Sequence, residues 1–280
     1  MSELKVQKSA GVSFVERKGT GSCLVFLHGI GSHGASFEPL FDQLPPDLHL
    51  IAWNAPGYGT SDPLAQVWPM AGEYAEALSE FLRARGFGPV ILIGHSLGTL
   101  IASAFAWAYP DRVSQLVLAS CAAGYGVPMG GEMPASVAAR INDLNAVGPS
   151  EFARTRAVRL VFEPEQNSDV VALVQDGMSK VNSSGYAQAV RMLASGTLFD
   201  TLRQVTVPCS FITGTEDHVT PPAQTLDAAK AWATSRGVTP EVAQIEQAGH
   251  AVYVQQPQAF AATLLRLVAP SHQMIGDTND

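Results

Sequence analysis

Short runs of apolar residues recur along the chain, and segments with helical periodicity separate most of them. The runs are rich in Val, Ile, Leu and Phe and are too short for helices, which is typical of strands covered on both faces. After a first β-like segment near the N-terminus, they lie at residues 12–16, 23–27, 48–53, 89–93, 113–119, 209–213 and 242–245. Apolar positions at helical spacing predict helices at 37–44, 74–85 and 260–267, with an Ala-rich helix starting after residue 96. Strands that alternate with helices predict a mostly parallel sheet flanked by helices on both faces.

This alternation lapses between residue 122 and about residue 204. A Gly- and Pro-rich stretch leads there into predicted helices at 136–146, 149–161, 168–181 and 185–194. We interpret these helices as a cap over the carboxyl edge of the sheet, where ligands bind in such folds. The predicted organisation is a core of residues 1–121 and 205–270, a helical cap of residues 122–204 inserted after the sixth core strand, and a flexible polar tail at 271–280.

The most informative stretch, Gly94-His95-Ser96-Leu97-Gly98, joins the apolar run at 89–93 to the Ala-rich helix. G-x-S-x-G between a strand and a helix is the nucleophile elbow, a tight turn that strains the serine backbone and exposes its Oγ. A Cβ at Gly94 or Gly98 would collide with so tight a turn. A glycine-rich turn with a capping serine would explain one of these glycines but not their symmetrical placement. The pattern therefore predicts that Ser96 is a nucleophile.

Composition and charge exclude several classes of function. The chain has 280 residues, 46% of them hydrophobic, which is enough for a sizeable core. A formal net charge of −8 and a sequence pI near 5.3 disfavour nucleic acid and anionic membrane surfaces as partners. The cysteines Cys23, Cys121 and Cys209 have neither metal-ligand nor disulfide spacing, and we expect them to be buried, reduced thiols.

No part of the sequence predicts attachment to a membrane. No apolar run approaches the roughly 18 residues that would cross one, and residues 1–6 do not resemble a signal peptide. We therefore expect a cytoplasmic protein whose partner is a small-molecule substrate, with no nucleic acid and no membrane. Self-association as a homodimer is compatible with the sequence and is kept as a hypothesis.

Motifs at residues 28–29, 94–98 and 249–250 follow one another at predicted strand ends. Together with the helical interruption they resemble the α/β-hydrolase fold family over nearly the whole chain. The resemblance implies an α/β-hydrolase fold and a serine hydrolase that needs neither a metal ion nor a cofactor. It is specific for the fold and the catalytic apparatus, and much less so for the substrate.

A serine alone is a poor nucleophile, so Ser96 needs a base within hydrogen-bond reach. The resemblance assigns this role to His250, which lies in the loop after the last predicted strand. The base in turn needs a buried carboxylate to hold one tautomer and to stabilise its cation. Asp217, in a G-x-x-D loop after the strand at 209–213, matches the family's position, and the order Ser, Asp, His along the chain is that of the fold. Its neighbour Glu216 is the alternative carboxylate, which we interpret as a solvated residue.

The developing oxyanion needs two preorganised hydrogen-bond donors. The backbone N–H of Leu97, the residue after the nucleophile, is predicted to supply one. The backbone N–H of Ile30, in the glycine-rich loop after the strand at 23–27, is predicted to supply the other. His28 is similar to a structural histidine of the family, and His28, Gly29 and His95 are also candidates for contact with the substrate.

Residues 54–62 resemble the family's D-x-P-G-x-G-x-S-D loop, with Asn54 where the family has Asp. The difference puts one loop-bracing hydrogen bond in doubt but leaves the proposed chemistry unaffected. We interpret this loop as structural turns.

Arginines of the predicted cap are candidates for binding a substrate carboxylate, because a guanidinium can donate two parallel hydrogen bonds to it. They are Arg140, Arg154, Arg156, Arg159 and Arg191. Arg159 leads because its neighbours in the sequence are apolar. The alternative interpretation is a set of exposed helix residues that pair with Glu and Asp.

A serine at the elbow favours an acyl-enzyme mechanism. It also argues against the haloalkane dehalogenases and epoxide hydrolases of this fold, which use Asp there. The remaining substrates are carboxylic esters, (enol-)lactones and, as in aromatic degradation, vinylogous 1,5-diketones cleaved at a C–C bond. The C–C hydrolases usually carry Pro-Gly after the glycine of the oxyanion loop, where this chain has Ser32-His33. They also usually carry Trp after the catalytic histidine, where this chain has Ala251. We therefore predict ester or lactone hydrolysis, with C–C hydrolysis as the alternative and a non-catalytic binding protein as the alternative from another class.

Overall fold

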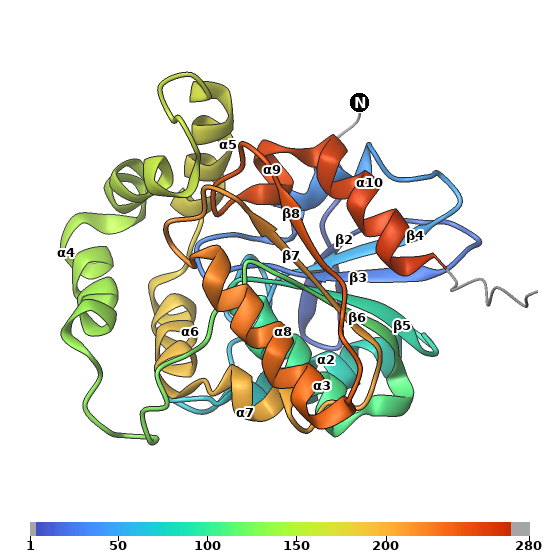
Figure 1. Cartoon of the computed structure of the whole chain (residues 1–280). Helices are drawn as coiled ribbons and strands as arrows, with labels where there is room; N and C mark the ends of the chain where they lie inside the picture. Colours follow the sequence, from blue (N-terminus) through green and yellow to red (C-terminus); the bar gives the residue numbers. More distant parts are fainter. Residues whose placement is uncertain (1–3, 270–280) are drawn as a thin grey trace, which may run out of the picture.

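The computed structural model describes residues 4–269, which fold around one eight-stranded sheet (Figure 1). The strands are β1 (Gln7–Ser9), β2 (Val12–Arg17), β3 (Cys23–Leu27), β4 (His49–Trp53), β5 (Val90–His95), β6 (Val113–Ala119), β7 (Cys209–Gly214) and β8 (Val242–Ile245). Their order in the sheet is β1-β2-β4-β3-β5-β6-β7-β8. Strand β2 pairs antiparallel with β1 and with β4, whereas all neighbours from β4 to β8 are parallel. The predicted mostly parallel sheet is thus confirmed.

Helices connect the strands and form the segment between β6 and β7. The α-helices are α1 (Glu38–Phe41), α2 (Ala71–Ala84), α3 (Leu97–Ala108), α4 (Ala135–Ala157), α5 (Ser168–Ser179), α6 (Ser183–Ser195), α7 (Leu198–Leu202), α8 (Pro222–Arg236), α9 (Val252–Gln255) and α10 (Pro257–Val268). Within the described residues, the 3-10 helices are η1 (Gly34–Phe37), η2 (Pro110–Arg112) and η3 (Val158–Leu160). No helix within residues 4–269 is long and apolar enough to cross a membrane.

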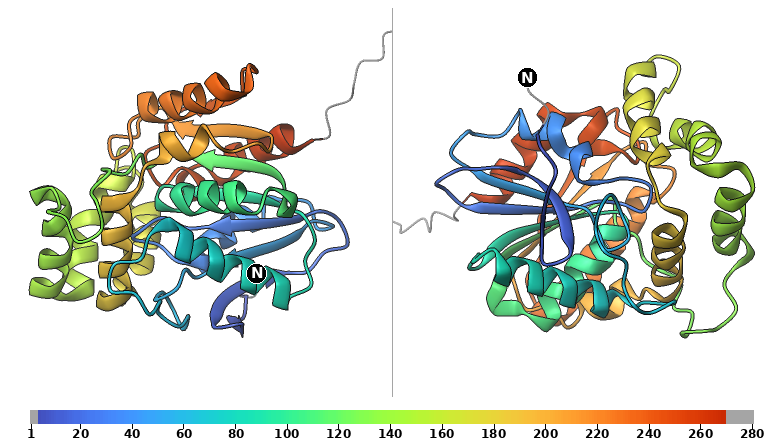
Figure 2. Two further views of the ribbon diagram at one scale, coloured as in Figure 1. Left: turned by 90° about the horizontal axis from the view of Figure 1, so that it is seen from below. Right: turned by 180° about the vertical axis from the view of Figure 1, so that it is seen from behind.

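Both faces of the sheet are buried, which explains why the parallel strands are continuously apolar. Along β3, Val25 and Leu27 enter one core while Leu24 and Phe26 enter the other. Helices α2, α3 and α8 contribute to the first core, and α1 and α10 contribute to the second (Figure 2). The sheet is therefore the middle layer of three.

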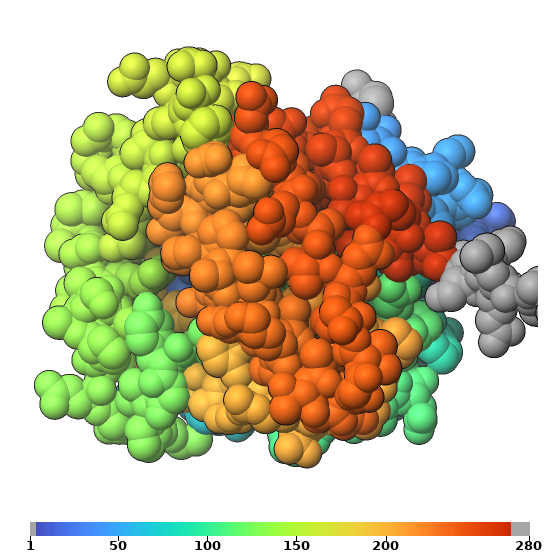
Figure 3. Space-filling view, viewed as in Figure 1, coloured from blue at the N-terminus to red at the C-terminus, as the bar shows by residue number. Residues whose placement is uncertain are grey.

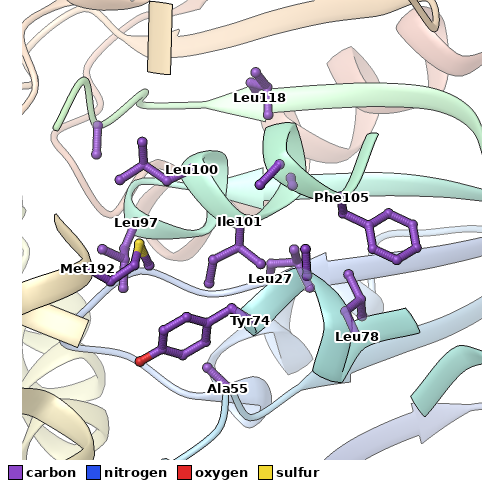
Figure 4. Packing of buried hydrophobic residues seen from close by; sticks show 14 of the residues in the cluster. Leu27, Ala55, Tyr74, Leu78, Leu97, Leu100, Ile101, Phe105, Leu118 and Met192 are labelled. Atoms are coloured by element: carbon purple, nitrogen blue, oxygen red, sulfur yellow. The ribbon is translucent and has the colours of Figure 1, made fainter. Parts of the chain in front are cut away.

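Helix α3 lies in the middle of the first core. All its residues from Leu97 to Ala106 are buried, and a helix that is apolar on every side is expected to be enclosed. Figure 4 shows Leu97, Leu100 and Ile101 among side chains of the sheet, of α2 and of α6. The helix that follows the nucleophile elbow is thus fixed by packing on several sides.

The helices between β6 and β7 gather beside one end of the sheet, at the left of Figure 1. In the space-filling view, this segment (green to yellow) meets the core segment that contains α8 (orange) along a seam (Figure 3). The backbone of α4 breaks at Gly148 (φ 74°, ψ 166°), so α4 is two helices, as the pattern predicts. Helix α7 instead packs against α3 and α8 of the core, although its residues fall in the segment predicted to be the cap.

The main differences from the predicted elements concern segments with weak patterns. The helix predicted at 37–44 is the shorter pair η1 and α1. Helix α8 is not predicted, because most of its apolar residues are alanines that form no strong stripe. Cys121 and Cys209 are buried as expected, but Cys23 is only half-buried, which corrects that expectation. The tail predicted at 271–280 lies outside the described residues.

Candidate active site

Ser96 occupies the turn between β5 and α3 in a strained backbone conformation, with φ 52° and ψ −118°. A Cβ at Gly94 would lie 2.5 Å from the carbonyl oxygen of Gly98, and a Cβ at Gly98 would lie 2.3 Å from that of Leu27. The Ser96 N–H donates a hydrogen bond to the Ala119 carbonyl at 2.9 Å. Contacts with the turn and the neighbouring strand therefore require both glycines, as the elbow predicts.

The side chains of Ser96, His250 and Asp217 form one hydrogen-bonded line. His250 Nε2 lies 2.9 Å from Ser96 Oγ, and His250 Nδ1 lies 2.9 Å from Asp217 Oδ2 and 3.2 Å from Asp217 Oδ1. The three residues follow β5, β8 and β7, whose carboxyl ends lie at the same edge of the parallel sheet. All three are buried. The sheet therefore brings Asp217 and His250 to Ser96, from which each is more than a hundred positions away in the chain.

Asp217 is fixed by hydrogen bonds from the chain just after it. Its Oδ1 accepts the backbone N–H groups of Val219 and Thr220, each at 2.9 Å, and its Oδ2 accepts the Thr220 hydroxyl at 2.9 Å. Burial alone would raise the pKa of Asp217, but the charge of His250 and hydrogen bonds from His250 and Thr220 hold that pKa well below its ordinary value. The ionised carboxylate favours a proton on His250 Nδ1, which leaves Nε2 as the acceptor that faces Ser96.

Two hydrogen bonds of His28 fix the loop after β3, which carries the predicted oxyanion donor Ile30. The Ala55 N–H donates to His28 Nε2 at 3.0 Å, so the ring proton lies on Nδ1, which donates to the Gly29 carbonyl at 2.8 Å. In a trans peptide the N–H points away from the carbonyl, so the Ile30 N–H is directed away from His28. Leu97 is the first residue of α3, where an N–H lacks an intrahelical acceptor. This arrangement supports Ile30 and Leu97 as the two donors.

A cavity of about 580 Å³ lies over this arrangement. Ser96, His250, Ile30 and Leu97 line it together with residues of the segment between β6 and β7 that is predicted to be the cap, including Leu160 and Tyr186. Its size is within the range of pockets for small molecules. Among residues 4–269, no group of three or more His, Cys, Asp and Glu side chains is placed to hold a metal ion.

Comparison with known proteins identifies the family. Residues 24–263 match the family model described as the alpha/beta hydrolase family, which is most of the chain. The chain belongs to the alpha/beta hydrolase family. The α/β-hydrolase fold predicted from the sequence is thereby confirmed, and the chain is a hydrolase of the serine type.

Relatives and solved structures of the α/β-hydrolases agree with this placement. A pimeloyl-[acyl-carrier protein] methyl ester esterase from Aliivibrio salmonicida is 26% identical over 93% of this chain and 97% of its own. An (E)-2-((N-methylformamido)methylene)succinate hydrolase from Acinetobacter baylyi is 27% identical over 71% of this chain and 74% of its own. The enol-lactonase from Burkholderia xenovorans LB400 superimposes with a TM-score of 0.79 at 19% identity and covers 95% of this chain and 100% of its own.

The predicted substrate contacts do not all reach the cavity of this α/β-hydrolase. His28 is fully buried, and both of its ring nitrogens bind backbone groups, so its predicted contact with the substrate is wrong. Gly29, His95 and Arg159 do line the cavity. His95 is also tied to the base, because its Nε2 donates to the carbonyl oxygen of His250 at 2.8 Å.

Asn54 makes hydrogen bonds that brace its loop, although the family has Asp at this position. Its Oδ1 accepts the Gly34 N–H at 2.8 Å, and its Nδ2 donates to Ser13 Oγ at 2.9 Å. An aspartate could not make the second bond as a donor. The amide of Asn54 therefore braces the loop in place of the family's aspartate.

Three residues near the site are not predicted from the sequence. Thr220 donates to the carboxylate of Asp217, and the hydroxyl of Tyr58 donates to the carbonyl of Ile30 at 2.7 Å. Gln255 contacts the loop that carries His250. The position of Thr220 three residues after an aspartate is a usable signal, since short polar side chains often bond to nearby groups in loops. Nothing in the sequence marks Tyr58 or Gln255, because their partners are backbone groups, which every residue has.

The free energy of unfolding is expected to fall as the pH drops from about 6.5 towards 4. Burial lowers the pKa of His28 from 6.5 to about 4. Burial and the nearby charge of His250 lower the pKa of His95 from 6.5 to about 3. The unfolded chain therefore binds protons in a range where the folded chain does not, which costs on the order of 5 kcal/mol by pH 4. The low pKa of Asp217 acts only below its ordinary value of 3.8 and does not contribute in this range.

Urea unfolding at pH 7, 6, 5 and 4 measures this dependence. His95→Gln should flatten it, whereas His218→Gln should leave it unchanged because His218 is exposed. If the free energy of unfolding of the wild type were constant between pH 7 and pH 5, this would contradict the claim that His28 and His95 are buried in their neutral form.

Proposed function

We propose that this protein hydrolyses a small carboxylic ester or lactone through an acyl-enzyme on Ser96. The observation that supports this most strongly is the unbroken line from Ser96 Oγ through His250 to Asp217 at the floor of the cavity. His250 Nε2 takes the proton of Ser96 as Oγ attacks the carbonyl carbon, and then gives it to the leaving oxygen. The backbone N–H groups of Ile30 and Leu97 stabilise the oxyanion, and water releases the acyl group by the same steps.

The relatives' names agree with ester chemistry. The Aliivibrio relative is named as a methyl ester esterase, and the Burkholderia structure, which shares the fold, is titled an enol-lactonase. A panel of short-chain 4-nitrophenyl esters, enol-lactones and a meta-cleavage dienoate tests the proposed reaction. We expect turnover of an ester or lactone to exceed that of the dienoate. A dienoate hydrolysed faster than every ester and lactone would establish the C–C alternative instead.

We also propose that the preferred substrate carries a carboxylate near the bond that is cleaved. Arg140, Arg156 and Arg159 of the cap line the cavity. Within the described part of the chain, Arg159 makes no ion pair, whereas Arg156 pairs with Asp143 and stacks on Phe152. Arg140 bonds to Tyr186. The name of the Acinetobacter relative specifies a succinate, which is a dicarboxylate.

Arg154 and Arg191 are less suited to this role. Arg154 is exposed and bound to Glu151 through two of its nitrogens, and Arg191 donates to the carbonyl of Val67. Neither lines the cavity. Arg159 lines the cavity and makes no ion pair with any residue between 4 and 269, and is therefore the first choice for binding a carboxylate.

Replacement of Arg159 by Gln is expected to impair an anionic ester and spare a neutral one. Mono-4-nitrophenyl succinate and 4-nitrophenyl butyrate have acyl chains of equal length and differ in the terminal carboxylate. Loss of a charge-assisted hydrogen bond should lower kcat/KM for the succinate by ~10-fold, with butyrate within about twofold. Arg154→Gln is the matched control and should change neither. An equal effect of Arg159→Gln on both esters would rule out a carboxylate contact.

A further inference from the structure

A short segment of the cap binds directly to the loop that carries His250. The Ala251 N–H donates to the Leu160 carbonyl at 2.9 Å, immediately after the catalytic histidine. Gly249, immediately before it, is packed so closely that a Cβ there would lie 2.8 Å from both the Leu160 oxygen and the Phe162 nitrogen. Residues 160–162, which we call the cap clamp, thus contact the chain on both sides of His250.

One buried side chain, Gln255 of α9, completes this contact. Its Oε1 accepts two backbone N–H groups, that of Gly249 in the core and that of Phe162 in the cap clamp, each at 3.0 Å. Its Nε2 donates to the Phe162 carbonyl at 2.8 Å. The single amide therefore joins the cap to the catalytic loop through three hydrogen bonds. A buried amide with all these partners has a fixed orientation, and removing it leaves three backbone groups without their partner.

Gln255 itself does not line the cavity, but the first residue of the cap clamp and the residue before it do. Leu160 lines the cavity, as does Arg159 just before it. A substrate that contacts these residues contacts the same stretch of chain that holds the base. The cap and the loop of His250 are thus linked by one direct bond between peptide groups and by the buried amide of Gln255.

We propose that Gln255 is a positioning residue, which sets the place of His250 by fixing the cap clamp against residues 249–251. The proposal rests on the proposed function, in which His250 is the base. Misplacement of a catalytic group by about 1 Å can cost roughly 100-fold in rate. The effect of losing Gln255 should therefore fall on kcat, because no substrate contact is removed.

Three variants test this role. Gln255→Met has a similar volume and loses all three hydrogen bonds. Gln255→Glu keeps an oxygen that can accept both N–H groups and loses the donor to Phe162. Gln256→Met is the matched control, because Gln256 is the next residue and its amide makes one exposed bond, to the Gln247 carbonyl at 3.2 Å.

With 4-nitrophenyl butyrate, Gln255→Met is expected to lower kcat by ~10- to 100-fold with KM within about threefold, while Gln256→Met retains the wild-type kcat. Gln255→Glu should lie between them. Its kcat relative to wild type should rise as the pH falls, since a protonated Glu can again donate to the Phe162 carbonyl. Taking the ratio at each pH removes the pH dependence that the variant shares with the wild type.

Thermal unfolding of each variant separates positioning from a loss of the fold. The proposal is overturned if Gln255→Met keeps kcat within twofold of wild type, or if its loss of kcat is matched by Gln256→Met. It is also overturned if the ratio for Gln255→Glu does not change with pH. A wild-type protein that turns over no ester or lactone would instead refute the proposed function.

Discussion

Replacement of Ser96 by Ala is expected to lower kcat/KM for a 4-nitrophenyl ester by ~10⁴- to 10⁶-fold. Alanine keeps the Cβ that the strained turn already accommodates and removes only the oxygen that lies 2.9 Å from His250 Nε2. The oxyanion donors and the cavity remain, so a small residual rate above that of water is expected. Steady-state kinetics with active-site titration of the wild type measures the loss.

Ser103→Ala is the matched control. Ser103 lies on α3, the helix that follows Ser96, is fully buried, and has a hydroxyl with no hydrogen-bond partner within residues 4–269. Its removal should leave kcat/KM within about twofold of wild type. If Ser96→Ala retained more than a tenth of the wild-type activity, Ser96 would not be the nucleophile.

Replacement of Asp217 by Asn is expected to lower kcat by ~10³- to 10⁴-fold. Because the N–H groups of Val219 and Thr220 both point at Oδ1, the amide oxygen of Asn would take that place. The amide NH₂ would then face His250 Nδ1 at the position of Oδ2. It would donate to Nδ1 and move the ring proton to Nε2, which can no longer accept the proton of Ser96.

Glu216→Gln tests the specificity of this effect. Glu216 is the adjacent residue and the alternative carboxylate, but it is half-exposed and does not line the cavity. Its substitution should leave kcat unchanged. Equal losses for the two variants would show that charge near the loop, and not the hydrogen bond from His250, determines the rate.

The sequence predicts the central sheet well because its strands are covered on both faces. Continuous runs such as 23–27 and 113–119 leave little choice of structure, and the strands match them residue for residue. The segments with errors lack such a constraint. Helix α8 is stabilised by packing of small residues against β7 and α7, which no periodicity reveals. Helix α7 returns to the core within a segment that composition assigns to the cap.

The residues of the site likewise differ in how well the sequence predicts them. Ser96 and its two glycines are local, so the elbow motif is sufficient to predict their conformation. Asp217 and His250 could be expected near Ser96 because each follows a strand of one parallel sheet. Gln255 could not be found, because its partners are backbone N–H and C=O groups, which are the same in every sequence. The wrong prediction that His28 contacts the substrate has a similar cause, since the two hydrogen-bond partners of His28 are also peptide groups.

The central claim is that Ser96 is acylated during turnover. The most direct test mixes the wild-type protein with 4-nitrophenyl acetate, quenches it with acid during the burst of 4-nitrophenolate, and maps the modified peptide by mass spectrometry. One acetyl group on Ser96, at a stoichiometry equal to the burst, is the expected result. Turnover with no adduct on Ser96, or with the acetyl group on another residue, would contradict the mechanism.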